Sequence, residues 1–246
     1  NLADEYANLV SVYGVWKDTA VRLEGEAVRS LTLMFLQMWG MDEREPDTES
    51  YGRYLNVSLP PLPEAGGYVL PYADSPLDEE RVGESVYLDI LSHAERYVRI
   101  FTPYLILDET MVMALTFAAK RGVDVRIYTP GVPDKPTIYQ LTRSYFPHLL
   151  RAGVKIYSYT PGFLHAKTWL VDDRIAAVGT VNLDYRSLYL HFENSVLIYG
   201  GAVLEDVRKD LAEIERESKE VTLGDCRTGF VGTMYSAVLR LVAPLC

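Results

Sequence analysis

The segment Leu164–Asp172 (LHAKTWLVD) carries a histidine, a lysine and an aspartate whose spacing could support chemistry on one ligand. We predict a strand here, and the alternation of side chains along a strand places His165 and Lys167 on the same face. Asp172 follows Lys167 by five residues and would face the opposite way on a continuous strand. Strand parity therefore favours an architectural role for Asp172, such as pinning a turn.

A second polar group follows in Gly179–Asn182 (GTVN), at the end of another expected strand. It offers close backbone approach at the glycine, the Thr180 hydroxyl and the Asn182 amide, which together suit phosphate oxygens. Glu193 comes 28 residues after His165. We predict that its carboxylate accepts a hydrogen bond from His165 Nδ1, which would fix the tautomer and leave Nε2 free for chemistry.

Composition limits what these residues act on. The chain has 246 residues, 48% of them hydrophobic, which suits one large domain, or one domain plus part of another. Its 34 acidic and 24 basic residues give a net charge of -10, so we expect no nucleic-acid partner. Cys226 and Cys246 lack metal-type spacing, and we expect no metal, no other cofactor and no disulfide framework. The sequence contains no run of 18 apolar residues and therefore predicts no membrane span.

Strand and helix patterns alternate along the second half of the chain and predict an α/β fold with a mixed β-sheet flanked by helices. The expected strands are 97–102, 124–129, 154–159, 166–171 and 194–199, and the expected helices are 109–120, 136–152 and 202–219. An earlier helix, 28–39, should end at Gly40 and pack on a core in a partner domain. The C-terminal segment 231–245 mixes apolar residues with Arg240, so it could rest on a membrane interface or pack against the domain.

A weak internal repeat indicates domain duplication. Four residue pairs differ by 175 positions: Asp18 and Glu193, Val21 and Val196, Gly25 and Gly200, Val28 and Val203. Asn1-Leu2 matches Asn182-Leu183 at a slightly larger offset, although chance could explain parts of the repeat. We predict that residues 1–46 are the C-terminal remnant of a first domain, that 47–67 connect, and that 68–246 form a second, full domain.

The complete spacing, His165-x-Lys167, four residues, Asp172, six residues, Gly179-Thr180-x-Asn182, resembles the signature of the phospholipase D superfamily. Three further segments resemble bacterial cardiolipin synthases, and this resemblance covers essentially the whole chain. They are Phe101–Ile106 (FTPYLI), Ala119–Val125 (AKRGVDV) and Thr180–Leu188 (TVNLDYRSL).

The resemblance implies a phospholipase D-like fold with two signatures, of which Asn1 would be the last residue of the first. That first histidine and lysine would precede Asn1, so this chain would hold half of an active site. The expected catalytic residues are then His165, Lys167, Asp172 and Glu193, and the expected phosphate ligands are Lys167, Thr180, Asn182 and Asn1. Such enzymes pass through a phosphohistidine, and by analogy His165 would be the acid and base rather than the nucleophile.

For bacterial cardiolipin synthases, the resemblance implies that two phosphatidylglycerol molecules yield cardiolipin and glycerol. We therefore expect phosphatidylglycerol and other phospholipids as partners, together with the bacterial cell membrane, to which helices upstream of this chain would anchor the full-length protein. Two alternatives remain. The chain could be a phospholipase D or endonuclease-type phosphodiesterase whose site is built by a homodimer, or it could be an inert half that needs its missing N-terminal half.

Overall fold

The protein is described from a computed structural model that covers residues 3–41, 47–59, 66–227 and 229–245. An eight-stranded mixed sheet forms its centre, in the order β10-β5-β4-β3-β7-β8-β9-β2, and a two-stranded sheet pairs β1 with β6. Within the large sheet, β3, β4 and β5 run parallel and the remaining neighbours are antiparallel. The strands are β1 Val15–Lys17, β2 Gly67–Asp74, β3 Tyr97–Phe101, β4 Asp124–Pro130, β5 Lys155–Tyr159, β6 Gly162–Leu164, β7 Thr168–Val171, β8 Ile175–Gly179, β9 Glu193–Gly200 and β10 Ser218–Val221.

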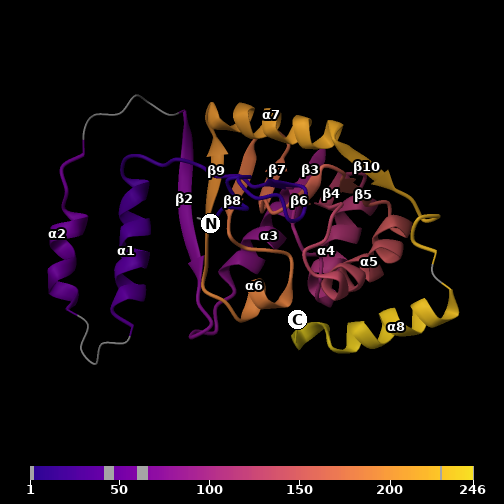
Figure 1. Ribbon diagram of the computed structural model, residues 1–246. Coiled ribbons are helices and arrows are strands. Elements are labelled where there is room, and N and C mark those ends of the chain that lie inside the picture. The colour runs from indigo at the N-terminus through magenta and orange to yellow at the C-terminus, as the bar shows by residue number, and fades with distance from the viewer. Residues whose placement is uncertain (1–2, 42–46, 60–65, 228, 246) are drawn as a thin grey trace.

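Helices cover both faces of the large sheet (Figure 1). One core lies between the sheet and α3, α4 and α5, and a second lies under α7. Figure 1 shows α1 and α2 outside the β2 edge and α8 on the outer side of α5. The helices are α1 Ala27–Trp39, η1 Thr48–Tyr51, α2 Gly52–Leu55, α3 Val82–His93, α4 Glu109–Lys120, α5 Pro136–Arg151, α6 Tyr185–Tyr189, α7 Val203–Arg216, α8 Phe230–Leu241 and η2 Ala243–Leu245.

The predicted α/β class with a mixed sheet flanked by helices is confirmed. Helix α4 has the predicted bounds because Asp108 caps it, accepting a hydrogen bond from the Met111 N–H at 2.8 Å. Helix α5 and strands β3, β4, β5 and β9 agree with prediction to within one residue. The predicted helix 202–219 is too long, because α7 ends at Arg216 and the chain then enters strand β10.

One local prediction is wrong. His165 and Lys167 lie in the connection between β6 and β7 rather than within a strand, although their side chains do converge. Helix α1 ends before Gly40 as predicted; it lies beside β2 and none of its residues is buried, so its packing on the core of a partner domain stays a prediction. The predicted connection 47–67 contains two short helical turns, η1 and α2, and ends where β2 begins at Gly67.

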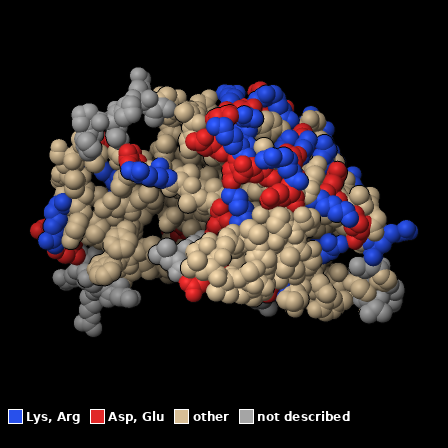
Figure 2. Space-filling view, turned by 45° about the horizontal axis from the view of Figure 1, so that its top comes forward, with Lys and Arg blue, Asp and Glu red and all other residues tan. Residues whose placement is uncertain are grey.

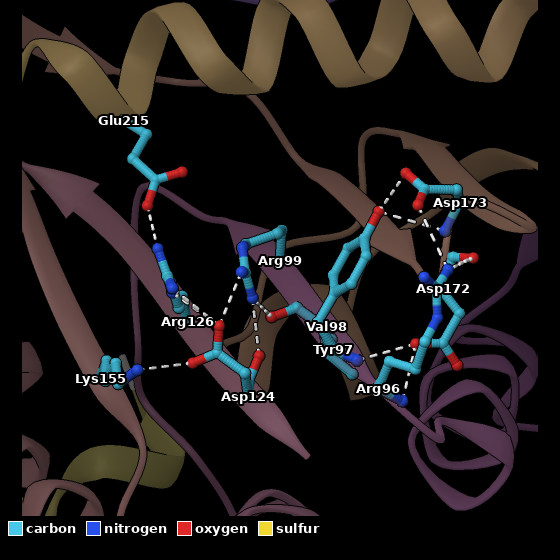
Figure 3. Close-up of polar contacts among 10 residues, drawn as sticks. All are labelled: Arg96, Tyr97, Val98, Arg99, Asp124, Arg126, Lys155, Asp172, Asp173 and Glu215. Carbon is cyan, nitrogen blue, oxygen red and sulfur yellow. Dashed lines mark hydrogen bonds and ion pairs between the residues drawn. The ribbon is translucent and has the colours of Figure 1, made fainter.

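A cluster of ion pairs ties the parallel strands to α7 (Figure 3). The Asp124 carboxylate of β4 lies 2.7 Å from Arg99 of β3 and 2.8 Å from both Arg126 of β4 and Lys155 beside it on β5. Arg126 also pairs with Glu215 of α7. Figure 2 shows positive and negative side chains intermixed over this face. This network links β3, β4 and β5 to one another and to α7 through side chains.

Candidate active site

A short parallel pairing brings the N-terminal segment to His165. Strands β1 and β6 align Lys17 with Leu164, and the His165 N–H donates to the Lys17 carbonyl at 2.7 Å. A Cβ atom on Gly162 would lie 2.3 Å from the Val15 backbone, so only glycine allows this approach. The pairing places Asp18, the next residue after β1, beside the imidazole.

Asp18 holds the His165 ring through a hydrogen bond. The distance from His165 Nδ1 to Asp18 Oδ2 is 2.9 Å, and both side chains are largely buried. With Nδ1 donating to the carboxylate, Nε2 carries the lone pair that can accept or return a proton. Burial would raise the pKa of Asp18, but the His165 hydrogen bond and the charges of His165 and Lys167 lower it. The carboxylate therefore stays ionised.

The prediction that Glu193 accepts from His165 Nδ1 is wrong. Glu193 instead accepts hydrogen bonds from the hydroxyls of Thr180 and, at 2.7 Å, Ser187. Burial raises the pKa of Glu193, and these two hydrogen bonds oppose that effect. Glu193 is thus near the signature residues but supports the loop that carries them.

Lys167 points at the free nitrogen of His165. Its Nζ lies 2.9 Å from His165 Nε2 and 2.5 Å from the His165 carbonyl oxygen. The residue is 6% exposed, and burial lowers the pKa of Lys167 to about 8, while the carboxylates of Asp18 and Glu193 oppose the change. Burial, reinforced by the Lys167 charge and opposed by Asp18, also lowers the pKa of His165 below 6.5. At neutral pH a neutral imidazole thus stands beside an ammonium group, which suits an anionic ligand.

The GTVN segment contributes differently from what its sequence suggests. A Cβ on Gly179 would lie 1.9 Å from Ser195 Oγ, so the glycine serves the close packing of β8 on β9 rather than an approach to a ligand. The Thr180 hydroxyl is engaged with Glu193. Asn182 forms a side-chain hydrogen bond with the buried Asp184. Burial raises the pKa of Asp184, and its hydrogen bonds, including the one with Asn182, oppose that change. The buried Asn182 Oδ1 has no hydrogen-bond partner within the described part of the chain.

Asp172 lies away from the imidazole, in agreement with the prediction made from its position five residues after Lys167. Its carboxylate accepts hydrogen bonds from the backbone N–H groups of Glu95, Arg96 and Tyr97 at 2.7 to 2.9 Å. Figure 3 shows those from Arg96 and Tyr97. Burial would raise the pKa of Asp172, but these three donors lower it. Asp172 has a φ of 54°, which marks the turn after β7. It pins the loop before β3, and no hydrogen bond links it to His165 among the described contacts.

Aromatic side chains that the sequence interpretation did not select surround His165. The ring centroids of Trp16, Tyr6 and Phe163 lie 5.1, 5.3 and 5.8 Å from that of the imidazole. Asp18 was also missed as a site residue, although the 175-residue repeat already paired it with Glu193. Asn1, the predicted phosphate ligand from the first signature, lies outside the described residues.

Neither a metal site nor a membrane span occurs in the described ranges. No group of three or more His, Cys, Asp or Glu side chains there could hold a metal ion. No helix in those ranges is long and apolar enough to cross a bilayer.

Comparison with known proteins identifies the family. The family model described as cardiolipin synthase, PLD-like domain, matches residues 87–214, just over half of the chain. A cardiolipin synthase from Halalkalibacterium halodurans is 41% identical over 246 residues, which is all of this chain and 48% of that protein. The chain spans about half the length of the curated relatives it matches.

Solved structures support the same fold. Phosphatidylserine synthase from Haemophilus influenzae has a TM-score of 0.60 at 18% identity, covering 83% of this chain and 54% of that one. Nuc, a phospholipase D family member from Salmonella typhimurium, has a TM-score of 0.54 at 18% identity, covering 63% of this chain and 98% of that one. The family match, with which this fold agrees, shows that the chain belongs to the bacterial cardiolipin synthase family of the phospholipase D superfamily.

Proposed function

We propose that this chain supplies the second-signature half of a phosphatidyltransferase that converts two phosphatidylglycerol molecules into cardiolipin and glycerol. The observation that carries the proposal is the arrangement at His165, with Nδ1 held by Asp18 and Nε2 beside Lys167. This arrangement gives one nitrogen for proton transfer and one fixed charge for a phosphoryl oxygen. The names of the relatives supply the lipid substrate class.

In the proposed reaction, the histidine of the first signature attacks phosphorus, and the bond from phosphorus to the glycerol oxygen breaks. For this step His165 must be the imidazolium ion, and its Nε2 gives a proton to that oxygen. A hydroxyl of the second phosphatidylglycerol then attacks the phosphohistidine, its proton passes to His165 Nε2, and the phosphorus–nitrogen bond breaks. Lys167 and Asn182 bind the phosphoryl oxygens throughout. The lowered pKa of His165 suits the second step, in which a neutral imidazole must accept a proton.

The repeat supports the proposal that half of the site lies on another unit. Asp18 and Glu193 are equivalent positions of the repeat, and Asp18 already serves His165. Because the repeat makes Glu193 equivalent to Asp18, Glu193 would accept a hydrogen bond from the histidine of the first signature. We therefore propose that residues 1–46 are the tail of a first domain, that 47–67 are a connection and that 68–246 are the second domain.

Helix α1 supports the same division. The 175-residue offset maps α7, Val203–Arg216, onto residues 28–41, which overlap α1. Helix α7 buries four residues, including Leu204 and Leu211, against the sheet, whereas α1 buries none in the described structure. We infer that α1 belongs to the first domain. The isolated chain is then inactive, and the longer protein works at the bacterial cell membrane.

The test uses a longer protein that contains both signatures, supplied with phosphatidylglycerol vesicles. We expect cardiolipin and glycerol in equal amounts, and no product from the 246-residue chain alone. His165→Ala should abolish turnover while a phosphatidyl adduct still forms on the other histidine, detectable by mass spectrometry of the intact protein. Cleavage of DNA without cardiolipin formation would overturn the proposal.

A second candidate is a phosphodiesterase with a homodimeric site. One observation favours this candidate. Part of this chain covers 98% of the length of Nuc, so a phospholipase D family member can consist of a single unit of this kind. Two copies would have to place both His165 side chains within about 3 to 3.5 Å of one phosphorus atom. Sedimentation equilibrium combined with hydrolysis of bis(p-nitrophenyl) phosphate distinguishes the two: a dimer that hydrolyses this ester supports the second candidate.

A further inference from the structure

Tyr104 and Asp134 lie at the same edge of the large sheet. Strands β3, β4 and β5 run parallel, so their carboxyl ends meet at one edge, where ligands commonly bind in α/β folds. Tyr104 follows the end of β3 by three residues, and Asp134 follows the end of β4 by four. Neither side chain takes part in the proposed proton transfers, so the role of both at this edge is open.

Backbone hydrogen bonds hold the loop after β4 next to His165. The Gly131 N–H donates to the Tyr159 carbonyl of β5 at 2.8 Å. The Val132 N–H donates to the Gly162 carbonyl of β6, three residues before His165, at 3.3 Å. A Cβ atom on Gly131 would lie 2.2 Å from the Tyr159 carbonyl oxygen, so this close approach requires glycine. The loop is therefore packed against the turn that leads to the imidazole.

Tyr104 reaches the same place from β3. Its ring centroid lies 6.4 Å from that of Phe163, and the Phe163 centroid lies 5.8 Å from that of the His165 imidazole. The Tyr104 hydroxyl donates to Asp134 Oδ2 at 2.6 Å. Burial and this hydrogen bond raise the pKa of Tyr104, so the phenol keeps its proton and remains a donor. Tyr104 thus links the Asp134 carboxylate to the aromatic group beside the imidazole.

The Asp134 carboxylate has spare acceptor capacity. Within the described residues it makes no ion pair, and it accepts only the hydrogen bond from Tyr104. Asp134 comes just before Lys135, the N-cap residue of α5, but no side-chain hydrogen bond caps the start of that helix. An ionised carboxylate has about four acceptor positions. Since Asp134 is partly exposed, its Oδ1 can accept hydrogen bonds from a bound ligand.

The charges around Asp134 favour a neutral hydroxyl group over a cation as that ligand. Lys135 Nζ lies 5.4 Å from the Tyr104 ring centroid. Burial lowers the pKa of Lys167 to about 8, and Asp134 is one of the carboxylates whose charge opposes this change. Two lysine side chains therefore lie within reach of the field of Asp134, and both repel a further cation such as an ethanolamine headgroup. Glycerol hydroxyls donate hydrogen bonds without carrying a charge.

We propose that Asp134, positioned by Tyr104, binds the glycerol headgroup through its hydroxyl groups and thereby selects a polyol as the acceptor. This inference rests on the proposed transfer reaction. In the second step, a primary hydroxyl of the acceptor forms the bond to phosphorus, the phosphorus–nitrogen bond of the phosphohistidine breaks, and the hydroxyl proton passes to His165 Nε2. Asp134 would accept a hydrogen bond from the neighbouring hydroxyl of the same headgroup, which forms no bond to phosphorus.

Competition between two alcohols tests the proposal. The longer protein with both signatures receives phosphatidylglycerol and equal concentrations of ¹³C-labelled glycerol and 1-propanol, which share a three-carbon chain and a primary hydroxyl. The products, labelled phosphatidylglycerol and phosphatidylpropanol, come from one phosphohistidine, so their ratio is independent of the amount of folded enzyme. Asp134→Ala should lower this ratio at least about tenfold, because a hydrogen bond to a charged group is lost.

Two further variants separate selection from structural support. Tyr104→Phe keeps the carboxylate but removes its hydrogen-bond donor, and it should lower the product ratio by a smaller factor, about threefold. Asp206→Ala removes an exposed carboxylate from α7 and should leave the ratio unchanged.

Three outcomes would overturn the proposal. Less total product from Asp134→Ala at an unchanged ratio would limit Asp134 to a structural role. A loss confined to ethanolamine, supplied as a third acceptor, would assign Asp134 to a cationic headgroup. Absence of every transfer product from the unmodified two-signature protein would refute the proposed transfer reaction itself, and the selection of a polyol with it.

Discussion

Asp18 Oδ2 lies 2.9 Å from His165 Nδ1 although the two residues are 147 positions apart in the sequence. The three-residue pairing of β1 with β6 creates this contact, and Gly162 makes that pairing possible. The N-terminal segment is therefore part of the site rather than a peripheral strand. It sets which nitrogen of His165 is available for proton transfer.

Replacing Asp18 by Asn should lower the pKa of His165 further, because the carboxylate is the main group that opposes the effect of burial on the imidazole. The Nδ1–H tautomer should also become less dominant. Long-range ¹⁵N–¹H correlation spectra recorded across a pH titration measure both quantities. Glu193→Gln is the control, since Glu193 bonds to Thr180 and Ser187, and it should leave the tautomer unchanged. A changed tautomer in Glu193→Gln with an unchanged one in Asp18→Asn would contradict the assignment of Asp18 as the partner of His165.

Anion binding at the site should weaken as pH rises through about 8. Lys167 is protonated below its pKa of about 8, so its positive charge is present at neutral pH and is lost above that value. Sulfate is a suitable probe because its own charge does not change in this range. Titration calorimetry should show about tenfold weaker binding at pH 9 than at pH 7. Lys167→Met should weaken binding and abolish the pH dependence, whereas Lys209→Met on α7 should do neither.

Asp172→Asn should destabilise the fold without altering the site. The variant loses the negative charge that accepts three backbone hydrogen bonds, which should cost about 2 kcal/mol of unfolding free energy. Urea unfolding measures this cost, and sulfate affinity should be unchanged. Asp173→Asn, at the neighbouring and more exposed position, should cost less than about 1 kcal/mol. A loss of sulfate affinity at unchanged stability would assign Asp172 a direct role instead.

The Asp124 cluster should make stability sensitive to acid. Burial would raise the pKa of Asp124, but its bonds to Lys155, Arg126 and Arg99 hold it well below 3.8. Its contribution is therefore fully present above pH 3.8 and is lost as pH falls further, towards the lowered pKa. Asp124→Asn should cost about 2 kcal/mol at pH 7. The difference between variant and unmodified chain, measured by thermal unfolding, should shrink below pH 3.8, and a constant difference would contradict this account.

The sequence by itself determined the features that rest on local rules. The helical composition of residues 109–120 and the β-rich runs predicted α4 and the parallel strands, because residue propensity and side-chain periodicity act over a few residues. The predictions that His165 and Lys167 converge and that Asp172 is architectural both agree with the structure. They assumed one continuous strand, however, and the three residues lie outside β6 and β7.

Tertiary structure alone decided which carboxylate serves His165. Asp18 and Glu193 are equivalent in the repeat, and no local rule distinguishes them as partners of one imidazole. The choice follows from the pairing of β1 with β6, a contact of three residues per strand that is too short to leave a periodic signal. The exposed side of α8 was likewise undecided, because a helix with apolar residues on two sides does not reveal from its sequence which side the domain buries.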